Sequence, residues 1–345
     1  MPGGEGAPQT YEVRALHLDA GRKYFSASWI HRLLERMSAL GLTELQLHVS
    51  DDEGYRVASR SHPEVVSPEH LGPQDLARLA HAARDQGVRL VPALDVPGHL
   101  GAVLAHHPHL RASQTREGSR LLDYSRPEAV ALVLDLIDEL HEMLPSTAWC
   151  LGGDEAFDVT QETPIVERFP QLAAEAERRC GAGAHVLDGY VHFLGQVVAH
   201  LEDLGITDVR AWNDALYQPG TRQALPAQVT IGYWTDWHPS YPSLARVLAA
   251  GHRVINYSDR DLYYVLAGPD HPYAKRPTAQ SLTGWAPRRF PARPDGTCQD
   301  PQGQTPWLRG ASLAVWCDEP ERETQEQVWR GLEGPLEVFA HIMGG

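Results

Sequence analysis

Short apolar runs alternate with longer helical patterns along the whole chain of 345 residues. This order is typical of a parallel sheet whose strands are joined by helices. We expect eight strands, at Val13–Asp19, Glu44–Ser50, Arg89–Asp95, Ala148–Gly153, Val209–Asn213, Val229–Trp234, Arg253–Tyr257 and Ala311–Trp316. Helical patterns lie between most of them, at Ser28–Leu40, Pro73–Gln86, Pro127–Met143, His185–Leu204, Tyr241–Ala249 and Thr324–His341. Eight such units predict an α/β fold of the (β/α)8 TIM-barrel class, as a single domain over residues 10–343.

A doubly wound open sheet is the alternative for the same order of elements, but no glycine-rich phosphate loop follows the first expected strand. The barrel is therefore favoured. Its seventh helical position is irregular, because residues 268–309 are rich in proline and glycine and have no apolar period. Since this stretch contains Tyr273, Trp285, Phe290 and Trp307, we expect an ordered lip over the barrel mouth and not a disordered insertion.

The composition excludes several classes of partner. The formal net charge is −15, which repels phosphate backbones and anionic lipid surfaces, so neither nucleic acid nor a membrane is an expected partner. Four cysteines, Cys150, Cys180, Cys298 and Cys317, lack CxxC spacing and are expected to be free thiols. A neutral or cationic ligand fits this charge better, and the sequence does not fix the oligomeric state.

The N-terminal residues 1–9 are rich in glycine and proline and are expected to be flexible. They lack the basic and apolar regions of a signal peptide. The protein is therefore expected to be cytoplasmic if this N-terminus is natural, and secretion is the alternative if a signal peptide was removed.

In a barrel of this class the chemistry lies at the C-terminal ends of the strands. Polar and aromatic residues end every expected strand: Asp19; His48, Asp51 and Asp52; Asp95 and His99; Asp154 and Glu155; Trp212, Asn213 and Asp214; Trp234, Asp236 and Trp237; Tyr263 and Tyr264; Trp316 and Asp318. Each alone has an ordinary explanation, such as a helix cap or a core tryptophan. Their joint placement predicts one polar and aromatic site. Arg14, early in the first strand, is a further candidate for ligand contact, with a barrel-bottom ion pair as its alternative.

Two adjacent carboxylates follow a buried strand in the sequence Gly152-Gly153-Asp154-Glu155. Neighbouring residues on a strand point to opposite faces, so the two acids are expected to act on different atoms. Two acids in one site also push their pKa values apart, which separates a proton donor from a permanent anion. The first turn of a helix is the alternative explanation, and this segment alone leaves both open.

Carboxylates and several tryptophans around one mouth indicate a sugar pocket, because aromatic faces stack on the apolar faces of sugar rings. Glycoside hydrolysis is the reaction that such a pocket favours. Most glycosidases flank the bond that they cleave with two carboxyls from different strands. Here the best candidate acids are neighbours, so the second one is expected to serve a different atom.

Seven segments together resemble a known family. They are VRALHLDAGRKYF, LQLHVSDDEGYR, ALDVPGH, LGGDE, AWNDAL, NYSDRDLYY and AVWCD, in this order. They are similar to glycoside hydrolase family 20, the β-N-acetylhexosaminidases, over roughly residues 11–320. The chain looks most like the single-domain bacterial members, because the separate N-terminal domain of larger relatives is absent from the sequence.

The resemblance implies an exo-acting, retaining enzyme that uses substrate-assisted catalysis and no cofactor or metal. The 2-acetamido oxygen of a β-linked N-acetylhexosamine glycan would attack the anomeric carbon and form an oxazolinium intermediate. Glu155 would be the general acid and base, Asp154 would hold the acetamido N–H, and Tyr263 would donate to the acetamido oxygen. Such positioning is a proximity effect of roughly 7 to 11 kcal/mol in well-oriented reactions.

The same resemblance assigns supporting residues. Trp212, Trp234 and Trp316 would wall the sugar, and Arg14 would bind ring hydroxyls. His99, together with Asp51 or Asp52, would adjust the pKa of the proton donor. Of these two aspartates, we expect Asp52 to be the partner of His99.

Two positions depart from the family pattern. Asp318 stands where similar enzymes commonly have a glutamate, which puts contact with the O4 or O6 hydroxyl and the choice between gluco and galacto sugars in doubt. Asp158 stands where an aromatic residue is found in the similar single-domain enzymes. The acidic mouth would favour partly deacetylated, cationic poly-N-acetylglucosamine.

Two other functions remain open from the sequence. A metal-dependent hydrolase or deacetylase could use His48, Asp51, Asp95 and His99 as ligands. A non-catalytic sugar-binding protein could retain the same scaffold, because fold does not fix function.

Overall fold

The structure is a computed structural model, and it describes residues 11–271, 274–293, 298–299 and 306–344. Residues 1–9, which the sequence predicts to be flexible, and Tyr273 of the expected lip lie outside the described residues. The same holds for the side chain of Cys298, whereas Cys150, Cys180 and Cys317 are free thiols as predicted.

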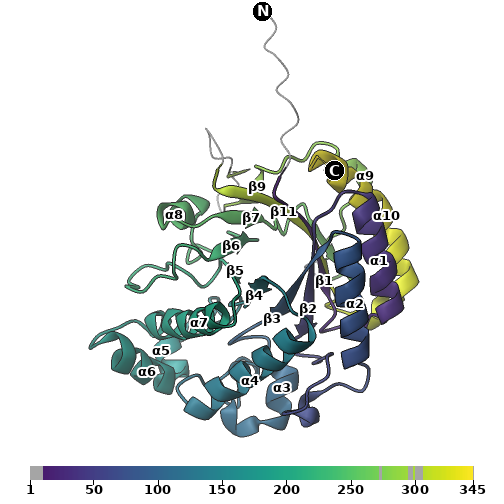
Figure 1. Cartoon of the computed structure of the whole chain (residues 1–345). Helices are drawn as coiled ribbons and strands as arrows, with labels where there is room; N and C mark the ends of the chain where they lie inside the picture. The colour runs from purple at the N-terminus through teal and green to yellow at the C-terminus, as the bar shows by residue number, and fades with distance from the viewer. Residues whose placement is uncertain (1–10, 272–273, 294–297, 300–305, 345) are drawn as a thin grey trace, which may run out of the picture.

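Parallel strands close into a barrel with helices around the outside (Figure 1), which confirms the predicted (β/α)8 class. The sheet follows chain order and closes because the last strand pairs with the first, with Val13 beside Gly310. Its strands are β1 (Val13–Asp19), β2 (Glu44–Ser50), β3 (Arg89–Leu94), β4 (Ala148–Cys150), β5 (Asp208–Trp212), β6 (Thr230–Tyr233), β7 (Val254–Asn256), β8 (Tyr263–Val265) and β11 (Leu308–Trp316). Their bounds lie close to the expected ones.

The seventh barrel position is built from two short segments. β7 pairs with the first half of β11, and β8 pairs with the second half, where Tyr263 lies beside Ala314. A six-residue turn, residues 257–262, separates them. The sequence predicted one strand here that leads on to Tyr263, and the added pairing of β8 is what fixes that tyrosine at the C-terminal end of the barrel.

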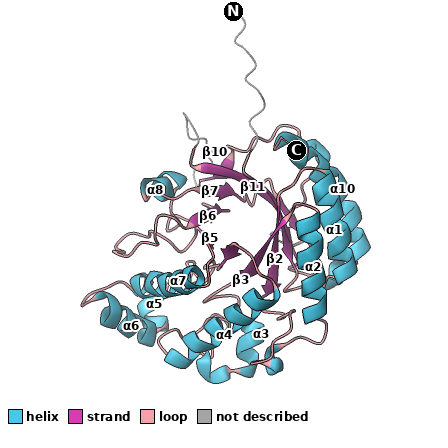
Figure 2. Ribbon diagram, in the orientation of Figure 1, coloured by secondary structure: helices cyan, strands magenta, loops and turns pink. Residues whose placement is uncertain are grey.

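Helices cover the outer face of the strands (Figure 2). The predicted helices are found as α1 (Ala27–Ala39), α2 (Pro73–Asp85), α4 (Pro127–Met143), α7 (Val186–Asp203), α8 (Leu244–Ala249) and α10 (Gln325–Ile342). Further helices were not predicted: η1 (Pro63–Val65), α3 (Gly101–His106), η2 (Pro108–Leu110), α5 (Ile165–Arg168), α6 (Pro170–Cys180), α9 (Ala279–Leu282) and η3 (Pro320–Arg322). Within the described ranges, no helix combines the length and apolar character that a membrane span requires.

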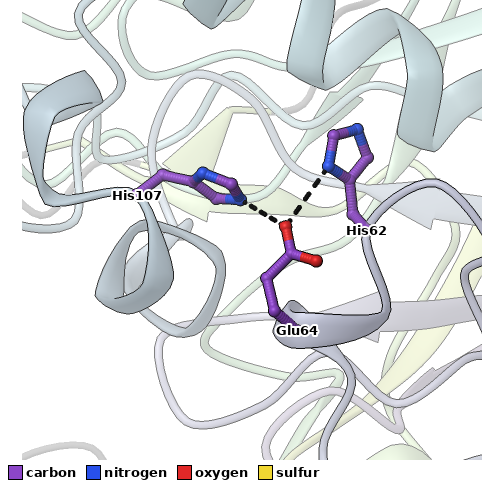
Figure 3. A group of neighbouring side chains, drawn as sticks. All are labelled: His62, Glu64 and His107. Carbon is purple, nitrogen blue, oxygen red and sulfur yellow. Dashed lines mark ion pairs between the residues drawn. The ribbon is translucent and has the colours of Figure 1, made fainter.

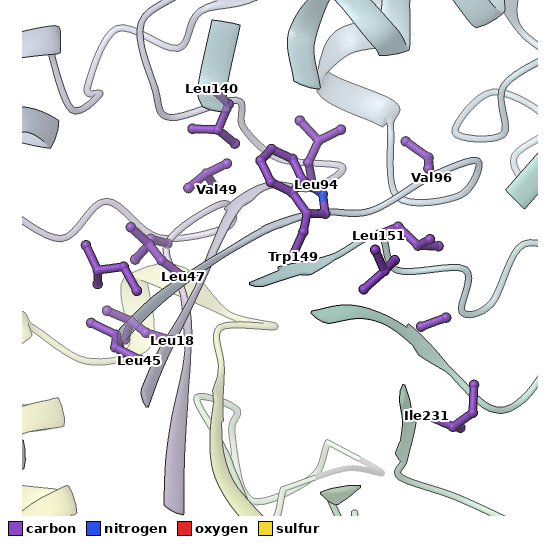
Figure 4. Close-up of a cluster of buried hydrophobic side chains, with 14 of the residues drawn as sticks. Leu18, Leu45, Leu47, Val49, Leu94, Val96, Leu140, Trp149, Leu151 and Ile231 are labelled. Carbon is purple, nitrogen blue, oxygen red and sulfur yellow. The ribbon is translucent and has the colours of Figure 1, made fainter. Parts of the chain in front are cut away.

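Strand alternation divides the core into two layers. Along β2, Leu45, Leu47 and Val49 point outward and pack with the helices in the cluster drawn in Figure 4, to which α4 contributes Leu140. The alternate side chains of β2 are polar and buried inside the barrel, where Gln46 bonds His17 Nδ1 at 3.0 Å. The barrel interior therefore combines these polar side chains with a smaller apolar cluster that includes Ala15, Ala93, Cys150 and Ile255.

An ion network closes the lower end of the barrel interior. Arg210, fully buried on β5, pairs with Glu44 at 2.7 Å and with Asp208 at 2.7 Å. Arg309 joins the same network through Asp208 at 3.0 Å. Paired charges fill the bottom of the barrel, so the open end is the one at which the strands finish.

The irregular segment 268–309 is only partly the lip that the sequence predicts. Trp285 packs against Phe339 of α10, and Phe290, on the short strand β9 (Phe290–Ala292), packs against Trp307. β9 pairs with a second short strand, β10 (Cys298–Gln299). These aromatic residues therefore fill the outer layer where a seventh helix would lie, and they are not at the mouth.

Candidate active site

A pocket of about 380 Å³ opens at the C-terminal ends of the strands. It contains nine of the ten residues that the sequence assigned to catalysis or substrate binding: Asp52, His99, Asp154, Glu155, Trp212, Trp234, Tyr263, Trp316 and Asp318. Further lining residues are Arg22, Glu53, Arg116, Arg120, Trp237, Asp259, Val265, His271 and Lys275. The strand-end pattern thus located one real cavity.

Arg14 is the exception, and its prediction as a substrate-binding residue is wrong. It lies at the start of β1, the opposite end of the barrel, where its guanidinium donates to the carbonyls of Gly41 and Tyr11 at 2.7 Å. Among the described residues Arg14 has no ion-pair partner there either. The arginine in the pocket is Arg22, three residues beyond the end of β1.

Arg22 is held by carboxylates and an aromatic ring. Its guanidinium pairs with Asp19 and with Asp51, each at 3.0 Å, and lies 5.4 Å from the ring centre of Trp316. Asp19 is locked in turn, because it also accepts the backbone N–H of Cys317 at 2.9 Å. The first and last strands therefore fix a cation at the wall of the pocket.

Two glycines shape the turn that carries the adjacent acids. Gly152 has φ +79°, and a Cβ there would lie 2.5 Å from the Asp95 carboxylate. Gly153 has φ +92°, and a Cβ would lie 2.8 Å from the hydroxyl of Tyr190, which donates to the Gly153 carbonyl. Only glycine combines this backbone with so close an approach. The turn ends strand alternation and brings the next residue against Asp95.

The two acids have different environments. The Asp154 side chain is 12% exposed and that of Glu155 is 43% exposed. Burial raises the pKa of Asp154 well above its usual range, the charge of Asp95 raises it further, and His99 opposes both. The two acids therefore differ in burial, but the raised pKa of Asp154 runs against the permanent anion that was expected in the pair. The helix-start explanation fails because no helix begins there.

Glu155 is positioned by a residue that the sequence reasoning passed over. The Asp214 carboxylate accepts the Glu155 backbone N–H at 2.8 Å and the Trp234 indole N–H at 3.0 Å. Glu155 itself has φ +43°, a left-handed conformation that is costly for a residue with a side chain. Asp214 thus compensates a strained residue, and its place at the end of β5 was the signal available in the sequence.

His99 has Asp51, not Asp52, as its carboxylate partner, which corrects the assignment made from the sequence. Its Nδ1 lies 3.1 Å from Asp51, and its Nε2 faces Asp154 at 3.5 Å and Glu155 at 3.6 Å. Asp52 lines the pocket but turns away, to Arg120 at 3.0 Å and the Gly101 N–H at 3.0 Å. Asp51 and Asp52 are adjacent in this turn, yet their side chains point in different directions.

The charges of these neighbouring side chains change one another's pKa values. Burial disfavours the charged form of His99, but the carboxylates of Asp51 and Asp154 outweigh burial and hold its pKa well above the usual range. Burial would likewise raise the pKa of Asp51, but Arg22 and His99 hold it well below its usual range. The centre of the site therefore favours an anionic Asp51 beside a cationic His99, which faces both acids.

Aromatic rings form the remaining wall. Trp234 and Tyr263 lie nearly parallel, at 7° and 6.2 Å between ring centres, and Tyr263 lies 5.8 Å from Trp316. Trp212 lies 6.3 Å from Trp316 across the pocket floor. Burial raises the pKa of Tyr263 well above its usual range, so its hydroxyl keeps its proton.

The mouth carries both signs of charge. Asp259 and Asp318 line the pocket together with Arg116, Arg120 and Lys275. Lys275 pairs with Asp259 at 2.8 Å. Among the described residues the mouth is thus mixed in charge, which removes the acidic mouth as an argument for cationic, partly deacetylated substrates.

The four residues of the alternative metal site do not come together as one ligand set, and Asp95 belongs to neither of the two groups that form there. Asp19, His48 and Asp51 form one group with ligand atoms close together, and Asp51, Asp52 and His99 form another. Both depend on Asp51, which Arg22 and two histidine nitrogens already contact. A metal ion there would have to lie beside the Arg22 guanidinium, so this donor set fits a cation poorly.

A (β/α)8 barrel whose open end holds carboxylates, an arginine and a wall of tryptophans has the architecture of a sugar-processing enzyme. The chain belongs to glycosyl hydrolase family 20, because the profile of that family's catalytic domain matches residues 11–332. The resemblance seen in the sequence is therefore confirmed.

Individual relatives are distant. The lacto-N-biosidase of Bifidobacterium bifidum is 24% identical over 96% of this chain and 29% of its own length. The β-hexosaminidase of Akkermansia muciniphila is 23% identical over 89% of this chain and 64% of its own length. The chain thus spans about a third of the first of these relatives.

Solved structures share the fold over nearly the whole chain. Dispersin B matches with a TM-score of 0.75 at 21% identity, covering 98% of this chain and all of that one. The β-N-acetylhexosaminidase of Bacteroides fragilis matches with a TM-score of 0.76 at 20% identity, covering 96% of this chain and 65% of that one.

Proposed function

We propose that the protein is an exo-acting, retaining β-N-acetylhexosaminidase that uses substrate-assisted catalysis. It would remove terminal β-linked N-acetylglucosamine, and N-acetylgalactosamine is the second candidate sugar. The observation that carries the proposal is the adjacency of a buried acid, Asp154, and an exposed acid, Glu155, with Tyr263 and three tryptophans in one pocket. Membership in glycosyl hydrolase family 20 supports the proposal.

In the first step the acetamido oxygen of the substrate attacks the anomeric carbon as the glycosidic bond breaks. Glu155 donates its proton to the leaving oxygen, and an oxazolinium intermediate remains. In the second step Glu155, now a carboxylate, takes a proton from water, whose oxygen attacks the anomeric carbon and reopens the ring. Two displacements on one carbon retain its configuration.

The buried acid has a different task. Asp154 would accept the acetamido N–H, and Tyr263 would donate to the acetamido oxygen, so that the nucleophile is fixed in attack geometry. Positive charge develops on the acetamido group, and an anionic Asp154 stabilises it. Because burial and Asp95 oppose that anion in the free protein, the substrate N–H and His99 are the groups that favour it.

Arg22 takes the substrate-binding role that the sequence gave to Arg14. Its guanidinium is positioned at the pocket wall by Asp19 and Asp51, with donors available for ring hydroxyls. Asp318 lines the same wall and would accept from a hydroxyl. Burial raises the pKa of Asp318, and the Arg22 charge opposes this.

The test uses aryl β-N-acetylglucosaminides with good and poor leaving groups. Glu155→Gln should lose far more activity on poor leaving groups than on good ones, because only the former need the proton. Asp154→Asn should lose activity on both. A thiazoline analogue of the intermediate should inhibit strongly, whereas a sugar-binding protein would bind these ligands with no turnover. Normal turnover of natural oligosaccharides by Glu155→Gln would contradict the assignment.

A further inference from the structure

A second group of histidine and acid side chains lies outside the pocket. It consists of His62, Glu64 and His107 (Figure 3). His62 and Glu64 lie in the loop between β2 and α2, where Glu64 is part of η1. His107 lies between α3 and η2, in the connection from β3 to α4. Two loops that are far apart in the sequence thus meet through these three side chains.

The two imidazole rings converge on one oxygen of the carboxylate. Glu64 Oε1 lies 3.5 Å from His62 Nδ1 and 3.0 Å from His107 Nε2, as the dashed lines in Figure 3 mark. Metal–ligand bonds of roughly 2.0–2.2 Å place tetrahedral ligand atoms about 3.3–3.5 Å apart. One ligand atom of each residue lies within 4.8 Å of the others, so a small movement of His107 completes the set.

The contact between His107 and Glu64 is short but poorly aligned for a hydrogen bond. The buried Nε2 atom of His107 lies 3.0 Å from Glu64 Oε1, at a distance that suits an ion pair. A buried ring nitrogen whose hydrogen bond is poorly aligned gains free energy when a better partner binds it. The nitrogen points at a carboxylate oxygen, which is the environment that a cation would complete.

His62 also has the second contact that metal-binding histidines commonly show. While Nδ1 faces Glu64, its Nε2 faces Asp135 on α4 at 3.4 Å. A carboxylate behind a ligating histidine holds the ring orientation and makes the ligating nitrogen more basic. The His62 and His107 side chains are 17% and 18% exposed and Glu64 is 42% exposed, so a fourth position opens to water.

We propose that His62, Glu64 and His107 form a zinc site. Two imidazole nitrogens and one carboxylate oxygen are a ligand set that Zn²⁺ takes with water in its fourth position. Calcium and magnesium are disfavoured, since they take oxygen ligands almost throughout.

The site would join the two loops that carry pocket residues. Asp52 and Glu53 precede His62 in one loop, and Arg120 follows His107 in the other. In the pocket these loops are already joined by the Asp52–Arg120 pair at 3.0 Å. A zinc ion bound by His62, Glu64 and His107 would be a second link between the two loops. Its expected effect is therefore on the stability of the fold. The site does not depend on the proposed hydrolase activity.

The experiment titrates chelator-treated, untagged full-length protein with Zn²⁺ by calorimetry and follows the melting temperature Tm in parallel. We expect one equivalent of Zn²⁺ to bind and to raise Tm. His62→Ala, Glu64→Gln and His107→Ala should each lose this equivalent, while Asp135→Asn should weaken binding by roughly 10–100-fold. Co²⁺ bound in place of Zn²⁺ should give the visible absorption of a tetrahedral site in the parent protein only.

His81→Ala is the matched control, because His81 forms an exposed pair with Asp85 at 3.3 Å on α2 without a third ligand. It should bind zinc as the parent protein does. The proposal is overturned if the parent binds no stoichiometric zinc, or if the three ligand variants keep the parent's affinity. These readouts use no substrate, so they are independent of any failure of the proposed function.

Discussion

Asp214→Asn tests whether the hydrogen bond from the Glu155 backbone N–H to Asp214 positions Glu155. The Asp214 carboxylate accepts two donors, the Glu155 N–H at 2.8 Å and the Trp234 indole N–H at 3.0 Å. Asparagine offers one acceptor oxygen and an NH₂ group, so one of these donors would face another donor. Because Glu155 has φ +43°, its conformation depends on the bond that would be lost.

The expected change in stability is small because two effects oppose each other. Burial raises the pKa of Asp214 from 3.8 to about 6, against the bonds from Glu155 and Trp234. A raised carboxyl pKa stabilises the fold at low pH, and this contribution is lost as pH rises through about 6. At neutral pH the ionised Asp214 carboxylate therefore lowers the free energy of unfolding by roughly 3 kcal/mol, and asparagine removes this destabilisation. The donor that asparagine leaves unsatisfied destabilises the fold by about 1–3 kcal/mol.

The expected change in activity is large. A hydrogen bond to a charged group is worth about 1.5–3 kcal/mol, and its loss should lower kcat/KM by roughly 10- to 150-fold. The assay measures kcat/KM on an aryl β-N-acetylglucosaminide from about pH 4 to about pH 9, with Tm recorded for each protein. The variant should lack the rise in activity near pH 6 that ionisation of Asp214 gives.

Asp188→Asn is the control for loss of a buried acid. Asp188 accepts backbone N–H groups of His185, Arg222 and Gln223 at 2.6–2.8 Å, outside the pocket. Those bonds lower its pKa against the effect of burial, so asparagine should lower Tm and leave kcat/KM unchanged. Parent-like activity and an unchanged pH profile in Asp214→Asn would refute the positioning argument, as would equal losses of activity in both variants.

Three further outcomes are expected. Arg22→Met should lower kcat/KM on the aryl substrate by more than roughly 30-fold, because a buried charge pair is broken, whereas Arg14→Met should leave KM unchanged. Gly153→Ala should destabilise the fold by about 1–3 kcal/mol in thermal melts, since its φ is +92° and a Cβ would lie 2.8 Å from the Tyr190 hydroxyl; an unchanged Tm would contradict this. EDTA should leave kcat/KM unchanged while it lowers Tm, because zinc is proposed as a tie between loops and not as a participant in the reaction.

The barrel and the location of its pocket could be predicted because both follow from local patterns. Eight strands and their intervening helices are visible in the hydrophobic period, and the residues that end parallel strands must share one rim. Most of the missed helices, such as α5 with four residues, contain too few turns to show a period, whereas α6, with 11 residues, is not explained by its length. The division of the seventh strand depends on pairing with β11, which no local pattern records.

The errors within the site have geometric causes. Arg14 is the second residue of β1 and Arg22 follows its last residue, and at about 3.3 Å per residue the strand separates its two ends by roughly 20 Å. Direction along the chain decides which arginine lies in the pocket, and Arg22 follows the strand's C-terminal end. Asp51 and Asp52 differ by one residue in a turn, where side-chain direction depends on backbone angles that the residue types do not reveal. The meeting of His62 and His107 is likewise a matter of tertiary structure.

The adjacency of Asp154 and Glu155 is explained by the backbone that precedes them. Gly152 and Gly153, both with positive φ, end the strand early and turn Asp154 against Asp95 and His99. The left-handed Glu155 then projects into the open part of the pocket, with its N–H held by Asp214. Regular strand alternation would have sent one of the two acids out of the barrel. Two acids that are neighbours in sequence can therefore line one pocket only where the backbone leaves the strand, and the glycine pair is the sequence feature that makes this possible.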